Sequence, residues 1–208
     1  MAKSGKDSLS EYRKKRDFRK SPEPEGGKSK GGKPIFVIQK HDASSLHYDL
    51  RLEVDGVLKS WAVPKGPSTD PREKRLAVPT EDHPLDYADF EGVIPKDEYG
   101  GGTVMVWDRG TYRNLKEEDS GEDKGPVSMS RAIEDGHATF WLEGEKLQGG
   151  YALIRTGRGG DTRWLLVKMK DKEADARRNP VSTQPESALS GRSMEEIAEE
   201  EGGGEDED

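Results

Sequence analysis

The amino-acid sequence predicts a mainly β fold of the barrel or sandwich type. Several short segments rich in aromatic and β-branched residues are separated by turns that contain glycine. Polar and apolar residues alternate along the segment LHYDLRLEV, as they do in a strand with one buried face. Helical patterns are few. Short strands at such spacing are typical of an antiparallel barrel or sandwich.

The first three expected strands follow one another through short turns. Residues 35–41 (IFVIQKH) predict the first strand and residues 46–54 the second, with the four residues DASS as the turn between them. Asp55 and Gly56 form a dipeptide typical of a two-residue hairpin turn, which leads into a third strand at residues 57–64. These two turns predict antiparallel pairing of the three strands.

The later part of the chain continues the β pattern. A strand entered through the glycine run YGGG is expected at residues 103–114, and a loop at residues 116–130. Helices are expected only at residues 9–20 and 193–200. The remaining expected strands cover residues 138–144, 151–157 and 162–170.

The two ends of the chain differ in charge. Residues 1–33 carry 11 Lys and Arg against 5 Asp and Glu, whereas residues 187–208 carry 1 against 9. We therefore expect a basic N-terminal arm at residues 1–33, one folded domain at residues 34–171, and a polar, acidic and largely disordered tail at residues 172–208.

Composition excludes several kinds of chemistry. The chain has no cysteine, which excludes disulfides, thiolate metal sites and a cysteine nucleophile. It has neither an apolar run that would cross a membrane nor the apolar core of a signal peptide, so we expect a soluble, cytoplasmic protein with no membrane partner. The net charge of −8 argues against tight non-specific binding of nucleic acid, although a local basic patch remains compatible with such binding.

One strand carries a candidate site on its polar face. His47, Asp49 and Arg51 alternate with apolar residues and therefore point to the same side of the strand. The short turn brings His41 of the preceding strand beside them. Two imidazoles and one carboxylate suit Mn²⁺, Fe²⁺ or Zn²⁺, and a guanidinium suits a phosphate oxygen. The residues alone are equally compatible with an ordinary strand whose charged face is exposed to solvent.

Other polar residues are candidates of lower specificity. His83 and Tyr87 could contact a phosphate, although a histidine before proline is often a structural turn residue. Lys65 and Arg75 flank turns, so they are either phosphate-binding groups or simply exposed. The YGGG run lacks the lysine and the helix of a phosphate-binding loop, and we interpret it as structural.

Longer blocks of sequence are more specific. They are RDF-x-x-SPEP, FVIQKHDASSLHYDLRLE, WAVPKGPS, EDHPLDYADFEG-x-IP-x-x-EYGGG, VWDRGTY and WLLVKMKD. From about Leu9 to Asp171 their order resembles the 3′-phosphoesterase domain of bacterial DNA ligase D and its free-standing relatives. The resemblance implies a small, closed or nearly closed antiparallel β-barrel with a few short helices.

The resemblance also implies an activity. In that family the reaction is Mn²⁺-dependent trimming of 3′ ends during DNA end-joining repair, on DNA or RNA–DNA termini. We therefore expect a metal-dependent hydrolase that removes a 3′-terminal ribonucleoside from a primer and then the 3′-phosphate left behind. The metal ligands implied by the resemblance are His41, His47 and Asp49.

The same resemblance assigns the residues around the metal. Arg51 and His83 are expected to contact the phosphate, and Tyr87 completes the expected catalytic set. Residues 9–25 are expected to fold over the site. The surrounding polar residues expected to bind substrate are Gln39, Lys65, Arg75 and Glu81, with Arg16, Asp17 and Glu23 from the arm.

The sequence also departs from the family pattern. It ends in EEEGGGEDED without a ligase or polymerase module, so we expect a stand-alone enzyme that meets an end-joining ligase or polymerase in trans. We also expect a monomer. The alternative is a non-catalytic β-barrel module that binds nucleic-acid ends or a partner ligase through its basic arm and acidic tail. A third hypothesis is a small-molecule metallohydrolase or cupin-like oxygenase with the same ligand set.

Overall fold

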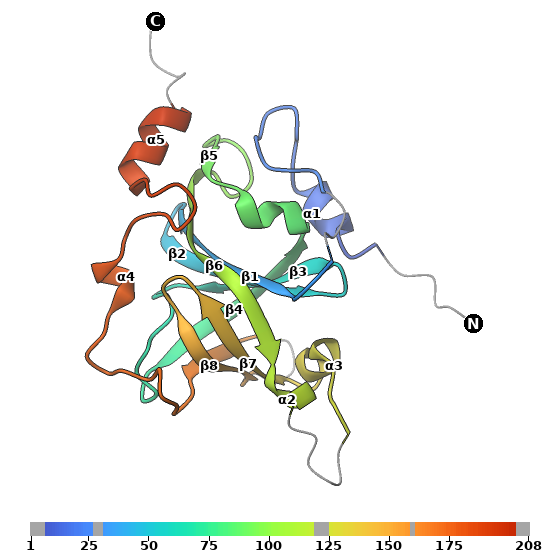
Figure 1. The fold of residues 1–208 in the computed structure, drawn as a ribbon. Helices are drawn as coiled ribbons and strands as arrows, with labels where there is room; N and C mark the ends of the chain where they lie inside the picture. Colours follow the sequence, from blue (N-terminus) through green and yellow to red (C-terminus); the bar gives the residue numbers. More distant parts are fainter. Residues whose placement is uncertain (1–6, 27–30, 119–124, 159–160, 203–208) are drawn as a thin grey trace, which may run out of the picture.

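The centre of the molecule is a closed antiparallel β-barrel (Figure 1). The computed structural model describes residues 7–26, 31–118, 125–158 and 161–202. In these ranges the eight barrel strands are β1 (Ile35–Asp42), β2 (Leu46–Val54), β3 (Val57–Val63), β4 (Lys74–His83), β6 (Gly102–Asn114), β7 (His137–Gly144), β8 (Gln148–Arg155) and β9 (Trp164–Lys168). They are ordered β1-β2-β3-β4-β9-β8-β7-β6, and β6 pairs with β1 to close the ring. The predicted mainly β, barrel-type fold is confirmed.

Short elements surround the barrel. In the described ranges they are α1 (Ser10–Lys14), the 3₁₀ helix η1 (Leu85–Asp89), β5 (Gly92–Ile94), α2 (Leu115–Glu118), α3 (Met129–Glu134), α4 (Pro180–Thr183) and α5 (Met194–Gly202). The strand β5 pairs with the first residues of β6 and is not part of the closed ring.

The first two hairpins form where the sequence predicts them. His41 on β1 pairs with His47 on β2, so the intervening turn is short. Between β2 and β3, Asp55 and Gly56 have φ values of 51° and 82°. Positive φ at both central residues is what a tight type I′ hairpin requires, and Asp-Gly is a dipeptide that tolerates it.

Alternation along the strands divides the apolar residues into two cores. Phe36 on β1 and Leu50 on β2 belong to the core inside the barrel, which also contains Trp61, Trp107 and Trp164. A second core lies on the outer face of the barrel and consists of Tyr12, Val37, Leu58, Leu85, Tyr87, Ala88, Phe90, Ile94, Val104 and Val106. This second core attaches α1, η1 and β5 to the outer face of β1 and β6.

The N-terminal arm packs onto this outer face. Tyr12 of α1 is completely buried, and its ring contacts the rings of Phe18 and Tyr87. Its hydroxyl donates a hydrogen bond to the carbonyl of Pro24. The helix covers less of the arm than the sequence predicts, because the chain turns at Asp17, whose carbonyl accepts the backbone N–H groups of the third and fourth residues that follow.

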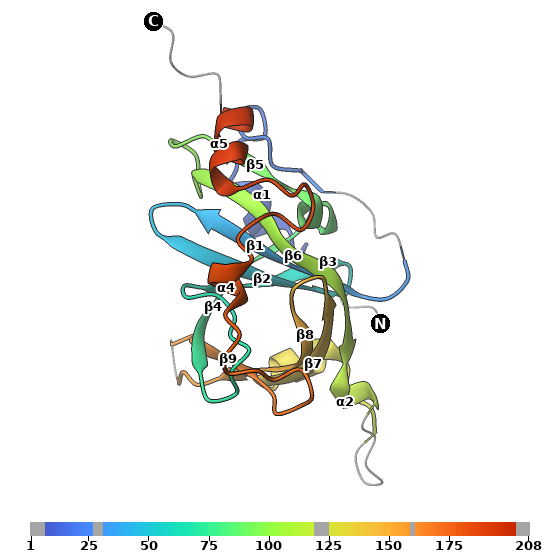
Figure 2. The same ribbon diagram turned by 60° about the vertical axis from the view of Figure 1, so that its left-hand side comes forward.

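The segment after β9 is more ordered than its composition suggests. We expected a largely disordered tail, but up to residue 202 the structure describes α4 and α5, and Ile197 of α5 is completely buried. The segment runs beside the barrel and places α5 against β5 and β6 (Figure 2). The Glu91 carboxylate accepts hydrogen bonds from Ser187 and Ser190. The buried residues Pro180 and Ile197, the partly buried Val181 and Met194, and hydrogen bonds to the barrel fix a segment that is otherwise polar. Residues 203–208 lie outside the described ranges.

The strand β4 is not predicted by the sequence pattern. Pro79 lies inside it, and proline usually marks an edge or the end of a strand. The register between β3 and β4 shifts between Leu58 and Ser60, where β4 has one extra residue. Because of this irregularity, side chains that would alternate between faces all line one cavity: Thr80, Glu81 and His83.

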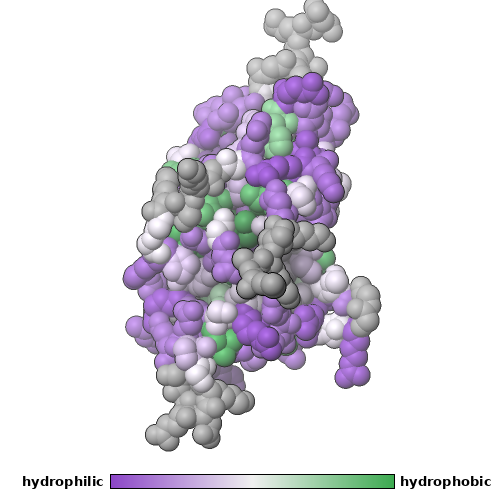
Figure 3. All heavy atoms as spheres, turned by 90° about the vertical axis from the view of Figure 1, so that its right-hand side faces the viewer, coloured by the Kyte–Doolittle hydropathy of each residue, from purple (hydrophilic) through white to green (hydrophobic). Residues whose placement is uncertain are grey.

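The surface agrees with the composition. On the side of the molecule that lies to the right in Figure 1, hydrophilic residues cover most of the surface and hydrophobic residues form small separate patches (Figure 3). Scattered apolar side chains of this kind are normal for a folded domain. Within the described part of the chain, none of the helices has the length and apolar character needed to span a membrane.

Candidate metal centre

A polar cavity of about 220 Å³ lies on the outer face of β1, β2 and β4. The loop between β5 and β6 and the N-terminal arm complete its wall. The lining residues are Arg16, His41, Ala43, His47, Asp49, Arg51, Thr80, Glu81, His83, Tyr87, Ile94, Tyr99 and Gly100. The polar face of β2 is therefore largely covered and is not an ordinary face exposed to solvent.

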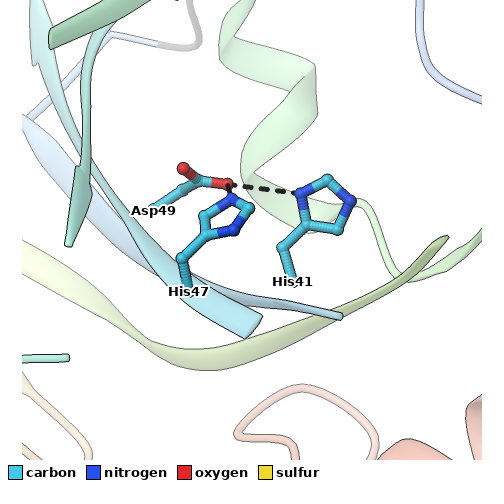
Figure 4. A group of neighbouring side chains, drawn as sticks. All are labelled: His41, His47 and Asp49. Atoms are coloured by element: carbon cyan, nitrogen blue, oxygen red, sulfur yellow. Dashed lines mark ion pairs between the residues drawn. The ribbon is translucent and has the colours of Figure 1, made fainter. Parts of the chain in front are cut away.

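Three potential metal ligands converge in this cavity (Figure 4). The Asp49 Oδ2 atom lies 3.3 Å from His47 Nε2 and 3.7 Å from His41 Nδ1. The three ligand atoms lie within 4.8 Å of one another. Two imidazole nitrogens and a carboxylate oxygen at this separation could hold one divalent ion and leave coordination positions for other ligands.

Backbone carbonyls orient both histidines. His41 Nε2 lies 2.7 Å from the carbonyl oxygen of Gly100, and His47 Nδ1 lies 3.0 Å from that of Ser45. Because a carbonyl only accepts, each of these nitrogens carries the proton. In the neutral form of each ring, which is the form that binds a metal, the lone pair then belongs to the nitrogen that faces Asp49; in the protonated form the same nitrogen donates a hydrogen bond to Asp49. Histidine ligands in metal sites typically donate their second N–H in this way, so the residues fit a bound metal.

Asp49 is ionised in this environment. Burial alone would raise its pKa, but the Arg51 charge and the hydrogen bonds from His41 and His47 hold the pKa of Asp49 well below its usual range. Burial alone would lower the pKa of His47. The hydrogen bond and the charge of Asp49 more than offset this effect, so the pKa of His47 is raised above its ordinary value. The carboxylate thus attracts positive charge to this corner of the cavity.

Arg51 is held in place from several sides. Only 3% of this residue is exposed. Its Nε donates to Gln39 Oε1 at 2.7 Å, and its Nη1 donates to Ser60 Oγ at 2.9 Å. Its Nη2 lies 3.4 Å from Asp49 Oδ2. The Gln39 amide in turn donates to the carbonyl of Tyr87 at 2.7 Å, so Gln39 fixes Arg51 relative to η1.

His83 lies between two guanidinium groups. Its Nδ1 is 2.9 Å from the carbonyl oxygen of Glu81 and 3.1 Å from Arg51 Nη1, and its Nε2 is 3.3 Å from Arg16 Nη2. Donation from Nδ1 to the carbonyl leaves Nε2 to accept from Arg16. Burial, together with the charges of Arg51 and Arg16, holds the pKa of His83 well below its ordinary value. The ring is therefore neutral, and the two cations beside it suit an anion such as a phosphate.

The N-terminal arm contributes buried ion pairs to the same wall. Arg16 Nε lies 2.7 Å from Glu23 Oε2, and Arg16 Nη1 lies 3.1 Å from Glu81 Oε1. The Tyr87 hydroxyl donates to Glu23 at 2.8 Å. Burial and the Glu23 charge raise the pKa of Tyr87 well above its ordinary value, so this hydroxyl stays protonated. Residues far apart in sequence thus share one hydrogen-bond network.

The structure does not bring every predicted site residue to the cavity. Lys65 is exposed just after β3. Arg75 forms an ion pair with Glu73 at 2.8 Å. Asp17 accepts hydrogen bonds from the backbone and the guanidinium of Arg19. None of these three predicted residues lines the cavity. By contrast, the other ten predicted residues line it or contact a residue that does.

The YGGG run is part of the site, which the sequence interpretation did not anticipate. Tyr99 and Gly100 line the cavity, and the Gly100 carbonyl orients His41. Gly100 has a φ of 74°, and a Cβ atom on Gly102 would clash with the carbonyl oxygen of Asp42. Glycine therefore allows this loop to approach the end of β1 closely. A run of glycines is the signal for such an approach, although it does not reveal which side chain is contacted.

Known proteins are similar in sequence to this chain. Residues 39–155, more than half of the chain, match the DNA ligase D 3′-phosphoesterase domain family. The chain is 53% identical over 192 residues to the multifunctional non-homologous end joining protein LigD of Pseudomonas aeruginosa. The aligned residues make up 89% of this chain and 22% of that protein.

Mycobacterial relatives give a similar result. The LigD protein of Mycolicibacterium smegmatis is 46% identical over 169 residues, covering 80% of this chain and 21% of the relative. The multifunctional non-homologous end joining DNA repair protein LigD of Mycobacterium tuberculosis is 45% identical over 173 residues, covering 80% and 20%. The chain thus spans about a fifth of the length of these relatives. The matched residues include all three potential metal ligands, and the chain belongs to the DNA ligase D 3′-phosphoesterase domain family.

Proposed function

We propose that the protein is a metal-dependent phosphoesterase that processes the 3′ ends of DNA or RNA–DNA primer strands. It removes a 3′-terminal ribonucleoside and then hydrolyses the remaining 3′-phosphate. The observation that carries this proposal is the convergence of the ligand set His41, His47 and Asp49 with the Arg51 guanidinium in one cavity. Membership of a phosphoesterase domain family supports the same conclusion.

Mn²⁺ is the proposed ion, since a site of two imidazoles and one carboxylate without sulfur accepts it. A bound ion supplies Lewis acidity toward a phosphate oxygen and toward water. Asp49, which stays ionised, contributes the negative charge of the ligand set, and the carbonyls of Gly100 and Ser45 keep the two imidazoles in the tautomers that can coordinate.

Arg51 and Arg16 bind the phosphate in this proposal. Both guanidinium groups line the cavity and approach His83, so two non-bridging oxygens of one phosphate can be held by planar groups of donors. Gln39 and Ser60 keep Arg51 in its orientation before the substrate arrives. Such preorganised donors stabilise the charge that develops in the transition state.

The His83 ring is neutral in the free protein, and in this proposal it contacts the phosphate when the substrate binds. Because the charges of Arg51 and Arg16 contribute to its low pKa, an arriving phosphate that neutralises them raises that pKa. The ring then becomes able to accept a proton and to donate it to the leaving oxygen. Tyr87, with its protonated hydroxyl on Glu23, keeps the arm attached to this wall.

The biological setting is also a proposal. The relatives are named for non-homologous end joining, and we place this protein in the same repair process, with an end-joining ligase or polymerase as partner. Activity on nucleic-acid ends separates this proposal from the alternative of a barrel that only binds such ends.

An end-processing assay tests the proposal. A 5′-labelled primer–template that ends in one ribonucleotide, or in a 3′-phosphate, is incubated with the protein and MnCl₂. We expect product with wild type, none with His41→Ala, and wild-type activity with His137→Ala, a matched change at an exposed histidine on β7. Identical products from wild type and His41→Ala would reject the site. Binding without any hydrolysis by wild type would favour the non-catalytic module.

A further inference from the structure

Tyr99 is an exposed aromatic residue in the wall of a cavity that is lined mostly by polar and charged residues. It lines the cavity, yet 48% of its surface is accessible to solvent. Of the large hydrophobic residues that are exposed in the described part of the chain, Tyr99 alone lines this cavity. It therefore stands at the mouth, where the cavity meets the solvent.

The position of Tyr99 is fixed on both sides. Its neighbour Gly100 contacts His41 through the carbonyl, so the ring is attached one residue away from the metal ligands. On the arm side, Lys15 Nζ lies 3.4 Å from the Tyr99 hydroxyl and 4.9 Å from the ring centroid, and Arg16 Cζ lies 5.4 Å from the centroid. A tyrosine held in this way presents its exposed surface in a defined place and loses little side-chain entropy when a ligand packs against it.

The cavity is small for a nucleotide. Its volume of about 220 Å³ has to hold a metal ion and the phosphate at the wall formed by Arg51 and His83. A nucleoside joined to that phosphate therefore extends toward the mouth. The exposed aromatic surface that meets it there belongs to Tyr99.

We propose that Tyr99 is the stacking platform for the terminal nucleobase of the strand whose phosphate binds at the metal centre. This inference rests on the proposed function and adds what the site recognises beyond the phosphate. Stacking of a base on an aromatic ring is tolerant of sequence, because every base has a π-face. The residue would thus favour nucleic-acid ends over small phosphate esters without selecting one base.

Substrates with and without the terminal base test this inference. Primers carry a 3′-phosphate on either a normal nucleotide or an abasic tetrahydrofuran residue, and KM and kcat are measured for wild type, Tyr99→Ala and Tyr99→Phe with MnCl₂. We expect Tyr99→Ala to raise KM for the normal end by about tenfold, since base–aromatic stacking contributes at about this level. On the abasic end Tyr99→Ala should equal wild type. Tyr99→Phe keeps the ring and should resemble wild type on both ends.

Even if Tyr99→Ala is impaired, three results would overturn the inference. One is an equal loss for Tyr99→Ala on the normal and the abasic end, which would mean that the ring does not act on the base. Another is a loss for Tyr99→Phe as large as for Tyr99→Ala, which would assign the effect to the contact between the hydroxyl and Lys15. The third is weaker Mn²⁺ binding by Tyr99→Ala in calorimetry, which would assign the loss of activity to a changed orientation of His41.

Failure of the inference and failure of the proposed function are distinguishable. If wild type processes neither end with Mn²⁺, the proposed function fails and the inference fails with it. If wild type is active and Tyr99→Ala is equally active on the normal end, only the inference is rejected.

Discussion

Two of the regions in which the protein buries charged groups treat these groups differently. Near the end of β9, the Lys168 ammonium lies 2.8 and 2.7 Å from the two carboxylate oxygens of Asp171, and 3.0 and 3.1 Å from the carbonyl oxygens of Gly150 and Met169. These partners are close neighbours in sequence or on the adjacent strand. In the cavity, Asp49 Oδ2 is approached by His41, His47 and Arg51, which are also close in sequence or on the adjacent strand, but these groups line an open space.

The difference teaches how to separate a structural charge from a binding site. All protons of the Lys168 ammonium have an acceptor, so this cation has no capacity left for a ligand. In the cavity, two imidazole lone pairs and two guanidinium groups face a common space. A saturated buried charge stabilises the fold, whereas ligand-type side chains gathered around a cavity are candidates for binding a metal and an anion.

The largest expected effect is loss of the ionised ligand. Asp49→Asn keeps the shape of the side chain but removes its charge, and we expect activity to fall by at least about a thousandfold, equivalent to about 4 kcal/mol in the barrier. Calorimetric titration with MnCl₂ should show affinity reduced by at least about a hundredfold. A variant that binds Mn²⁺ like wild type would show that this cluster is structural, as at Lys168.

The matched change in the other region should affect stability instead. Lys168→Met removes a buried cation and leaves the Asp171 carboxylate without its ion-pair partner, so we expect a loss of about 3 kcal/mol in the free energy of unfolding. Urea denaturation measures this loss. Mn²⁺ affinity at a temperature where the variant is folded should equal that of wild type. Weaker metal binding without destabilisation would remove the contrast between the two regions.

A smaller effect is expected for the support of Arg51. Gln39→Ala removes the acceptor of the Arg51 Nε hydrogen bond and the donor to the Tyr87 carbonyl. Removing an orienting partner of this kind typically lowers activity by about 10- to 100-fold. We expect the loss in kcat rather than in Mn²⁺ affinity, as shown by the end-processing assay and calorimetry together. Unchanged kcat would mean that Arg51 is positioned without Gln39.

The smallest effect concerns pH. Burial alone would raise the pKa of Asp171, but its hydrogen bond with Lys168 and others lower it below the usual value of 3.8. A carboxyl group with a lower pKa in the folded state contributes stability above its unfolded pKa, and this contribution is lost as the pH falls through the folded pKa. Urea unfolding at pH 7, 4 and 3 should therefore show a shallower loss of stability for Lys168→Met than for wild type. If the free energy of unfolding falls equally with pH in both proteins, the ion pair between Lys168 and Asp171 does not lower the pKa of Asp171.

Local patterns predicted much of the fold. The two hairpins of β1, β2 and β3 follow from alternation and from Asp55-Gly56, because both signals act between residues that are close in sequence. The strand β4 escaped prediction because Pro79 opposes a strand locally, and long-range pairing with β3 overrides that preference. The order of α5 depends on the burial of Ile197, which no local pattern reveals.

The residues of the candidate site also fall into those that local patterns predict and those that they do not. The pairing of His41 with His47 was predictable, since they lie on adjacent strands joined by a short turn. Family resemblance supplied distant partners such as Arg16 and Glu23, which spacing does not reveal. It did not indicate Tyr99, because an exposed aromatic residue beside a glycine run has no local signature of a binding role.

The sequence by itself determined which residues share a face of β2, because successive Cβ atoms of a strand point to opposite sides. Only the tertiary structure decided that His47, Asp49 and Arg51 line a cavity instead of meeting bulk water. That outcome depends on the arm and η1, which pack on the outer face of the barrel through Tyr12, Leu85 and Tyr87. Burial of these apolar side chains offsets the entropy of fixing distant segments, and it is a property of the whole chain.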